Sequence, residues 1–527
     1  MNLGIAALVF GYGSFGVSAG DPAGAAWLVP MARVAVEHAE IPAFDPDTNR
    51  VFVAAGAVVA VIDVGAGTDA RVVQEIDVAD AAGFPADVGG EVSHVVVDPR
   101  GRGFFAATVI PSARASMPGR VVFVSTRSGL AVGAVWVGFQ PDGCEFSADG
   151  RSLVVVDEGE PTILPGPPLS VVDPPGSLSV IDLSSIADAD GLATLGQHAV
   201  ATYFVGGPKV DPSATRIHPF HATSAGLDLE PESVAVADRR AFVTFQENSA
   251  IGVFDLDARA WSALVPLAPI AREFDVSDRD GGIHVDTAID AWPMPDQIAI
   301  ARVPSTEGPD RVVLVVANEG DDRGDAFESP SPLADTARVG ELRERGRLAP
   351  TTPTTLDRLK VDAHHGDADG DGVLDRPLAL GTRSMSILDA DTLERLGDTG
   401  ASFERTLARE APSAFNADGK SDELRVDARS DDSGPEPEGV RTLRIDARTY
   451  AIVTLERPGA IALVDVTQPA EPRVLGIACV ALGGDRAPEG LAIVPAERSP
   501  IGEPMLVVAF EGSGTVVAYR LILPREV

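Results

Sequence analysis

Acidic residues recur at two matching places in a pattern that repeats along this chain. The first place is a turn before a short apolar run, and the second is the end of the following run. The first set is Asp142, Glu232, Asp296, Glu438 and Glu489, and the second set is Glu158, Glu247, Glu319, Glu456 and Glu511. If the repeats are superposed around one axis, each set forms a ring near the same end of that axis. Carboxylates that converge where little water reaches them cannot all stay ionised unless cations or arginines neutralise them.

Divalent cations with oxygen ligands are the natural counterions for such rings, and Ca²⁺ tolerates an irregular arrangement of ligands best. We therefore predict that the ring acids bind Ca²⁺. The alternative is that each acid accepts hydrogen bonds from N–H groups of the turns and from Arg323, Arg429 and Arg457.

A second acidic motif lies between the repeats. Asp367, Asp369 and Asp371, followed by Gly372, match the first half of an EF-hand loop, which has acids at positions 1, 3 and 5 and glycine at position 6. Position 12 is Leu378, so the bidentate glutamate of an EF-hand is missing. We predict a structural calcium loop with the ligands Asp367, Asp369, Asp371 and Asp375. A solvated acidic turn is the alternative.

Motifs of the common hydrolases are absent from the sequence. It contains no Gly-x-Ser-x-Gly, no P-loop and no His-Glu-x-x-His. Any hydrolysis would depend on a metal-activated water or on a nucleophile that no known motif identifies. In that case Arg323, Arg429 or Arg457 would act as the catalytic groups that stabilise developing negative charge.

Seven stretches share the same order of a turn followed by short apolar runs. The runs are rich in β-branched residues and too short for helices, and Gly and Pro separate them. The stretches begin near Glu40, His94, Pro141, Leu229, Pro295, Gly434 and Ala487. Such repeats predict an all-β protein, namely a β-propeller of about seven blades. A pair of β-sandwiches is the alternative.

Two segments interrupt this pattern. Residues 321–380 divide the fifth repeat and are too long for a plain connection, so we expect an insertion with its own structure, including a helix within residues 331–345. A smaller insertion spans residues 265–292. The calcium loop lies in the longer insertion. We expect one propeller domain over residues 35–527.

The overall composition limits the partners of the protein. Among 527 residues, 78 are acidic and 42 are basic, and the net charge of −36 disfavours nucleic acid and anionic membranes as partners. Residues 1–20 predict a secretory signal peptide, although no Lys or Arg precedes their apolar run. No later run of about 18 apolar residues predicts a membrane span. Cys144 and Cys479 lie in different repeats, which leaves a disulfide open but not indicated. We expect a monomeric protein that is secreted, periplasmic or at the cell surface.

Several longer motifs together resemble the choice-of-anchor I family. They are Leu229-Glu-Pro-Glu232, Gln246-Glu-Asn248, residues 277–282, Ala317-Asn-Glu-Gly-Asp321, residues 366–372, Arg383-Ser384, residues 429–439 and Leu455-Glu-Arg457. The resemblance covers nearly the whole chain after about residue 35. That family includes bacterial alkaline-phosphatase-like proteins and the mesenchyme-specific cell-surface glycoproteins of biomineralising animals. The resemblance implies a secreted or surface-attached β-propeller that depends on calcium.

The resemblance also implies further metal ligands by position. These are Asp321, Asp431 and Glu436, with Glu230, Asp278, Asp280 and Asp432 as additional motif acids. Three features depart from the family pattern. Asp173-Pro-Pro-Gly176 stands where Asp-Pro-Glu-Gly is usual, Ser433 stands where Lys or Asn is common, and no anchor follows Tyr519, so we expect this member to be released.

Two functions therefore remain open. The first is a metal-dependent phosphomonoesterase that acts on a small phosphoester. The second is a non-catalytic calcium-binding propeller that contacts an extracellular ligand, a matrix or a mineral. A quinone-dependent dehydrogenase is weaker, since its cofactor would need aromatic stacking and only 5% of the residues are aromatic.

Overall fold

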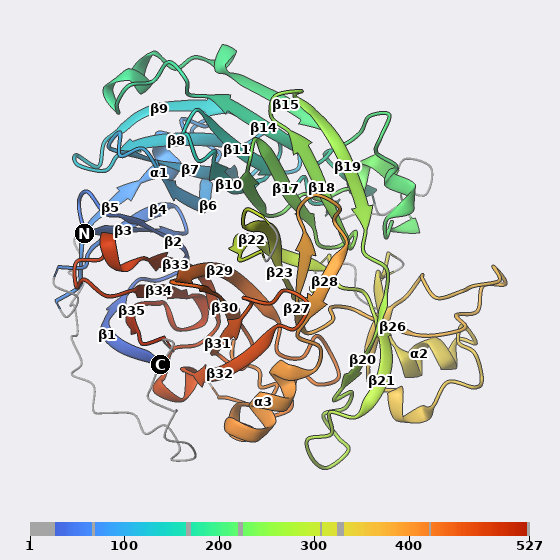
Figure 1. The fold of residues 1–527 in the computed structure, drawn as a ribbon. Coiled ribbons are helices and arrows are strands. Elements are labelled where there is room, and N and C mark those ends of the chain that lie inside the picture. Colours follow the sequence, from blue (N-terminus) through green and yellow to red (C-terminus); the bar gives the residue numbers. More distant parts are fainter. Residues whose placement is uncertain are drawn as a thin grey trace.

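Short β-strands form most of the regular structure of the protein. The computed structural model describes residues 27–65, 69–164, 170–219, 225–305, 308–323, 331, 333–420 and 423–523. Within these residues the strands form seven four-stranded antiparallel sheets, which we number in chain order (Figure 1). The predicted signal peptide at residues 1–20 lies outside the described residues.

The strands of each sheet are named in order from the innermost to the outermost. Sheet 1 contains β2 (Ala39–Asp45), β3 (Arg50–Ala55), β4 (Val58–Asp63) and β5 (Arg71–Asp77); sheet 2 contains β6 (Gly90–Val97), β7 (Phe104–Pro111), β8 (Arg120–Ser125) and β9 (Ala131–Trp136); sheet 3 contains β10 (Pro141–Phe146), β11 (Ser152–Asp157), β14 (Ser177–Asp182) and β15 (Val200–Phe204). Sheet 4 contains β16 (Val234–Ala237), β17 (Arg240–Phe245), β18 (Ala250–Asp255) and β19 (Ala260–Pro266); sheet 5 contains β22 (Pro295–Val303), β23 (Arg311–Asn318), β27 (Ser384–Asp389) and β28 (Arg395–Asp398). Sheet 6 contains β29 (Pro437–Ile445), β30 (Arg448–Leu455), β31 (Ala460–Asp465) and β32 (Arg473–Cys479); sheet 7 contains β33 (Pro488–Val494), β34 (Met505–Phe510), β35 (Thr515–Leu521) and β1 (Leu28–Ala35).

The sheets close into a ring around a common axis (Figure 1). Each innermost strand contacts the innermost strands of the two neighbouring sheets, and β33 of sheet 7 contacts β2 of sheet 1. The N-terminal strand β1 pairs with β35, from Leu28 opposite Leu521 to Ala35 opposite Thr515. Sheet 7 is thus built from both ends of the described chain, which locks the ring. The prediction of an all-β propeller is confirmed, and its first strand precedes the expected domain start at residue 35.

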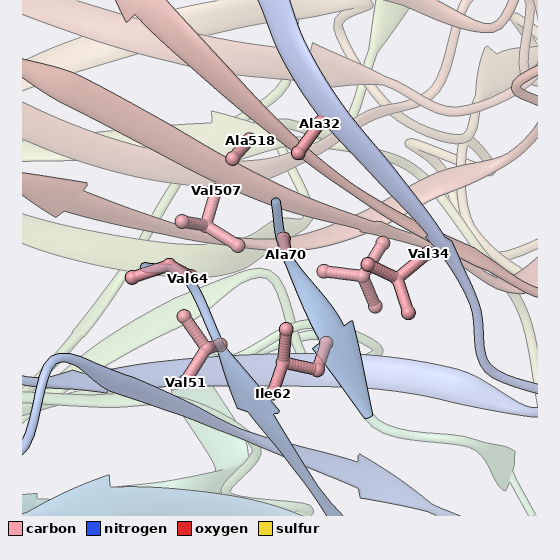
Figure 2. A pocket seen from close by; sticks show the side chains of 9 residues that line it. Ala32, Val34, Val51, Ile62, Val64, Ala70, Val507 and Ala518 are labelled. Atoms are coloured by element: carbon pink, nitrogen blue, oxygen red, sulfur yellow. The ribbon is translucent and has the colours of Figure 1, made fainter. Parts of the chain in front are cut away.

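The second strand of each sheet is buried on both faces, and this explains why these strands are apolar and do not alternate with polar residues, whereas outermost strands such as β5 alternate between exposed and covered positions. In β3, Phe52 stacks against Phe105 of sheet 2 with ring centroids 4.5 Å apart, while Val53 packs in a cluster with Val507 of sheet 7. A small cavity between sheets 1 and 7 is lined by alanine, valine and isoleucine alone (Figure 2). Its apolar walls offer no group that could fix a polar ligand.

The two insertions combine into one separate sheet. Its strands are, in order, β20 (Ile270–Phe274), β21 (Thr287–Ala291), β26 (Leu378–Ala379), β25 (Lys360–Asp362) and β24 (Thr336–Arg338). The parallel pairing of β21 with β26 joins the shorter insertion to the longer one. The helix expected within residues 331–345 is α2 (Val339–Glu344), which follows β24 and buries Val339 and Leu342 in the core of this insertion.

The remaining elements are short. They are α1 (Val78–Ala81), the hairpin of β12 (Thr162–Leu164) and β13 (Ser170–Val172), and α3 (Ser402–Glu410). No helix in the described part of the chain has the length and apolar character needed to cross a membrane. Cys144 and Cys479 are both free thiols.

Candidate metal centre

A β-bulge at the start of the innermost strand turns one acidic side chain toward the axis. In sheet 6, Pro437 pairs with Leu455 and Val440 with Val453, so Glu438 and Gly439 between them have no partner in the ladder. The same irregularity occurs in sheets 1, 3, 5 and 7. An extra residue in one strand re-aims a side chain, and proline is tolerated at such a place because it need not donate to the ladder.

The bulge position is therefore equivalent from sheet to sheet. We call its occupants the axial ring, and they are Glu40, Ser93, Asp142, Asp296, Glu438 and Glu489. We add Glu232 of sheet 4, which precedes β16 and whose N–H donates to the carbonyl oxygen of Thr244 at 3.1 Å. Ser93 takes the place of an acid in sheet 2, where the bulge lies between Val92 and His94. Glu40 belongs to the ring although the sequence pattern did not single it out, because Ala39 and Ile41 replace the flanking Pro and Gly.

The glycine after the acid lets the innermost strands approach each other closely. A Cβ atom on Gly439 would lie 2.7 Å from the carbonyl oxygen of Glu489, and one on Gly490 would lie 2.7 Å from that of Glu40. Such contacts are too short for any side chain, so only glycine fits. The Pro-Glu-Gly pattern thus combines a bulge, an acid and a close approach, and together these crowd the acids of neighbouring sheets.

The turn before the bulge fixes the second set of acids as well. His38, Gln140, Met294, Glu436 and Ala487, which precede the bulged residues, all have φ values between 45° and 54°. This left-handed conformation is uncommon for residues other than glycine and marks a turn that its surroundings hold in place. The carbonyl of Glu436 accepts the N–H of Glu456 at 2.9 Å, and that of Ala487 accepts the N–H of Glu511 at 3.0 Å.

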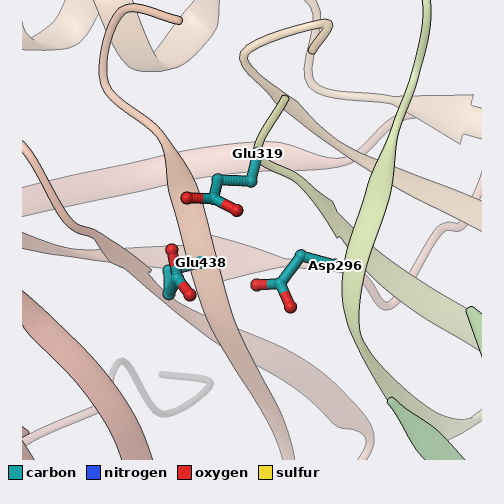
Figure 3. Close-up of side chains that lie close together, drawn as sticks. All are labelled: Asp296, Glu319 and Glu438. Atoms are coloured by element: carbon teal, nitrogen blue, oxygen red, sulfur yellow. The ribbon is translucent and has the colours of Figure 1, made fainter. Parts of the chain in front are cut away.

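The two sets of acids meet in compact groups. Asp296, Glu319 and Glu438, which we call cluster A, each offer an oxygen atom within 4.8 Å of the others (Figure 3). Asp296 is 5% exposed and Glu319 is 6% exposed. Glu456, Glu489 and Glu511 form a similar group, which we call cluster B. Glu319, Glu436 and Glu456 form a third group that links the two.

Several buried oxygen atoms near cluster A have no hydrogen-bond partner among the described residues. They are Oδ2 of Asp296, Oε2 of Glu232 and Oε1 of Gln246, whose Nε2 donates to Glu319 at 2.8 Å. A buried acceptor without a donor costs about 1–3 kcal/mol, and more if it is charged. A cation placed among these atoms would remove that cost for all of them.

Burial and mutual repulsion hold the pKa values of the ring acids high. Burial, followed by the charges of Glu489 and Glu91, raises the pKa of Glu40 to about 9. The pKa of Asp142 rises to about 7 through burial and then Glu489. For Glu438 burial is again the largest cause, followed by Glu319 and Glu489, and its pKa lies well above the usual range. A cation would replace the protons that these acids otherwise retain.

In sheet 4 the acid of the second set lies one residue later than in the other sheets that carry one. Gln246 stands where the other sheets place Glu158, Glu319, Glu456 and Glu511, and the predicted ligand Glu247 follows it. Burial raises the pKa of Glu247 to about 7, while Arg323 acts in the opposite direction. Burial also raises the pKa of Asp321 to about 6, with Asp322 and Glu436 as further causes.

The three arginines proposed as catalytic groups are held in ion pairs. Arg323, 4% exposed, pairs with Asp228, Glu230 and Asp335. Arg429 pairs with Asp432 and Glu436. Arg457 pairs with Glu436 and lies 3.1 Å from Glu456.

These pairs change the role of Glu436. Burial of Glu436 would raise its pKa, but Arg429 and Arg457 outweigh this effect and lower the pKa to about 2. The predicted ligand Asp431 lies elsewhere, against Arg338 and Arg358 of the longer insertion. The arginines therefore position acids at the edge of the site, and the acids of clusters A and B are those that converge.

The predicted calcium loop forms a separate exposed group. Asp367, Asp369 and Asp371 offer oxygen atoms within 4.8 Å of one another. Asp367 accepts the N–H groups of Gly370 and Gly372, which folds the loop around its carboxylate, and Asp375 accepts that of Ala368 at 2.7 Å. This geometry is compatible with a bound cation and with a solvated turn.

A comparison with models of protein families assigns this chain to a family. The model described as Choice-of-anchor I domain matches residues 40–469. The chain belongs to the choice-of-anchor I family. The match begins at Glu40 of the axial ring and ends before Glu489 and Glu511, so cluster B lies partly beyond the part that the family model covers.

One curated relative and several solved structures are similar to parts or all of the chain. Gigasin-3a of Magallana gigas is 30% identical over 184 residues, which are 32% of this chain and 64% of that protein. Hydrazine synthase of Kuenenia stuttgartiensis aligns with 93% of this chain and 97% of its own, at 11% identity and a TM-score of 0.46. A chain of the mitotic checkpoint complex aligns with 98% of this chain and 99% of its own, at 9% identity and a TM-score of 0.48. These structures tell nothing about the chemistry of this chain.

Proposed function

We propose that this choice-of-anchor I protein is an extracellular propeller whose function depends on a divalent cation, Ca²⁺ in the first place, bound at cluster A. The observation that carries the proposal is the set of buried, unpartnered oxygens of Glu232, Gln246 and Asp296 beside the converging carboxylates. Asp296, Glu319 and Glu438 would hold the cation, with Gln246 and Glu232 as further oxygen donors.

The chemistry of these donors favours Ca²⁺ over Mg²⁺. All of them are carboxylate or amide oxygens, the ligands that hard cations prefer. They come from three sheets and belong to side chains of different lengths, so the site has the irregular geometry that Ca²⁺ accepts and Mg²⁺ does not. The Asp367–Asp375 loop is proposed as a separate structural calcium site, where loss of the ion would affect stability only.

The family assignment supports a place outside the cell, since the choice-of-anchor description is typical of extracellular and cell-surface proteins. The net charge of −36 keeps such a protein soluble and draws cations to it. Contact with an extracellular ligand through the bound cation is the role that these properties fit best.

Binding of Ca²⁺ to the protein stripped with EDTA tests the proposal by isothermal titration calorimetry. The Asp296→Asn variant should lose one bound ion, whereas Asp369→Asn should lose a different one and leave the ion of cluster A in place. Equal stoichiometry in Asp296→Asn and in the unmodified protein would refute a cation site at cluster A.

A metal-dependent phosphomonoesterase is the second candidate, and Arg441 is the observation that favours it. Arg441 lies on β29 three residues after Glu438 and donates to Oε1 of Gln297 and to the carbonyl of Val440. Burial lowers the pKa of Arg441, and the charges of Glu145 and Asp296 oppose that shift. Within the described residues Arg441 forms no ion pair with a carboxylate, and its positive charge beside Asp296 would attract an anionic substrate. Turnover of p-nitrophenyl phosphate that requires Ca²⁺ and is lost in Arg441→Gln would establish this activity. Absence of turnover with any divalent metal would exclude it.

A further inference from the structure

Cluster B already contains a positive charge from the protein itself. The ammonium group of Lys420 lies 2.9 Å from Oε1 of Glu456 and 3.6 Å from Oε2 of Glu511. Glu456 is 1% exposed, whereas the side chain of Lys420 is 46% exposed. The ammonium thus reaches from solvent toward a deeply buried carboxylate.

The backbone places Lys420 over this cluster. A Cβ atom on Gly419 would lie 2.3 Å from the carbonyl oxygen of Arg457, so the segment before Lys420 packs directly on the chain that follows Glu456. Asp418 lies 3.9 Å from the guanidinium of Arg457 and also pairs with Arg425. The segment is therefore fixed, and only the last atoms of the lysine side chain need to move for the ammonium to leave.

The lysine that pairs with Glu456 is more exposed to solvent than the arginines of the other ion pairs of the site. Oε1 of Glu456 has no partner that meets hydrogen-bond geometry, although the ammonium lies within ion-pair distance of it. Glu436, in contrast, is enclosed by two arginines whose side chains are 21% and 15% exposed. Because Lys420 is about half exposed, water weakens its attraction to the acids, and an ion that binds three carboxylates directly would displace the lysine.

We propose that cluster B is a second divalent-cation site and that the ammonium of Lys420 occupies it in the cation-free protein. The oxygens of Glu456, Glu489 and Glu511 lie within 4.8 Å of one another, and the ammonium already contacts two of these three carboxylates, so it and a cation would compete for them. Binding of the second ion expels Lys420 into solvent, and this competition makes cluster B weaker than cluster A. The inference rests on the proposed function, since both sites are to bind the same class of ion.

Calorimetric titration with Ca²⁺ alone tests this competition. The background is Asp369→Asn with Asp371→Asn, which removes the exposed loop as a source of heat. In this background we expect a tight site and a weak site. Lys420→Gln should tighten the weak site about tenfold, which corresponds to about 1.4 kcal/mol, and leave the tight site unchanged.

Two controls make the result specific. Lys209→Gln removes one exposed positive charge elsewhere and should change neither affinity. Adding Glu511→Gln to Lys420→Gln should abolish the tightened site, while adding Asp296→Asn should abolish the other one. Circular dichroism of each variant establishes that it is folded.

The outcomes separate this inference from the proposed function. If Lys420→Gln has no effect, or no more effect than Lys209→Gln, Lys420 does not compete and the inference is wrong, while cluster A stands. If neither the background protein nor Lys420→Gln binds Ca²⁺, both the proposed function and the inference are wrong.

Discussion

Replacing Glu438 by glutamine should change stability in opposite directions with and without Ca²⁺. Glu438 lies between Glu319 and Glu489, and a hydrogen bond with Glu438 lowers the pKa of each of them. The single O–H of a protonated Glu438 serves only one of these acids at a time, whereas the amide group of the substituted glutamine has two N–H groups and carries no negative charge. At 4.8 Å and an effective dielectric constant of about 20, two ionised carboxylates repel each other by about 3.5 kcal/mol.

Protonation already relieves part of this repulsion in the unmodified protein, because the pKa of Glu438 is raised. We therefore expect Glu438→Gln to stabilise the EDTA-treated protein at pH 8 by about 1–3 kcal/mol. In Ca²⁺ at a hundred times its dissociation constant, the unmodified protein gains about 2.7 kcal/mol from binding, and the variant loses most of this gain. Compared with the unmodified protein, the variant should therefore have a higher midpoint of thermal unfolding in EDTA and a lower midpoint in Ca²⁺.

The assay is thermal unfolding followed by circular dichroism at pH 8, in EDTA and in Ca²⁺. One kcal/mol of unfolding free energy corresponds to about 1 °C in the midpoint for a domain of this size, because the unfolding entropy grows with chain length, and shifts of about 1–3 °C are measurable. Glu503→Gln is the matched control, since Glu503 is exposed and pairs with Arg520 at 3.4 Å. If Glu438→Gln lowers the midpoint equally in both buffers, Glu438 is a structural acceptor and the reasoning about cluster A is wrong.

Three further perturbations have definite expected outcomes. In EDTA the protein should lose stability as the pH rises from about 5 to 9. Acids with raised pKa values, such as Asp142 at about 7 and Glu456 at about 8, keep protons in the folded state that they release at lower pH in the unfolded state. Urea titrations at several pH values measure this, and a free energy of unfolding that rises over the range would contradict it. Asp369→Asn should lower the thermal midpoint in Ca²⁺ but not in EDTA; an equal drop in both buffers would exclude a calcium loop. Arg323→Met should lower the free energy of unfolding by about 3–5 kcal/mol, because it leaves buried acids unpaired, whereas Arg520→Met at a more exposed pair should lower it by about 0–1 kcal/mol. Equal losses in urea denaturation would contradict the buried ion-pair network.

The fold and part of the site could be predicted because the decisive signals are local. Six of the seven repeats carry a bulge in the first pair of strands, and residues such as Pro437, Glu438 and Gly439 are adjacent in the sequence. Their grouping around an axis then follows from the repetition itself. The resemblance to the choice-of-anchor I family, read from longer motifs, is confirmed by the family model.

Features that depend on contacts between distant segments could not be predicted in this way. Glu40 shares the bulge of the other ring acids, yet neither proline nor glycine flanks it. Gln246 takes a position that the sequence pattern assigned to Glu247, because only the strand register distinguishes two adjacent residues. The parallel pairing of β21 with β26 and the reach of Lys420 to Glu456 leave no trace in the local sequence.

The central claim is that a cation holds the converging acids of cluster A. The most direct measurement is an anomalous difference map from a crystal grown in Ca²⁺ and recorded at a long wavelength. The account predicts a peak about 2.3–2.6 Å from oxygen atoms of Asp296, Glu319 and Glu438. A map without that peak, in which the same side chains contact only water or one another, would contradict it.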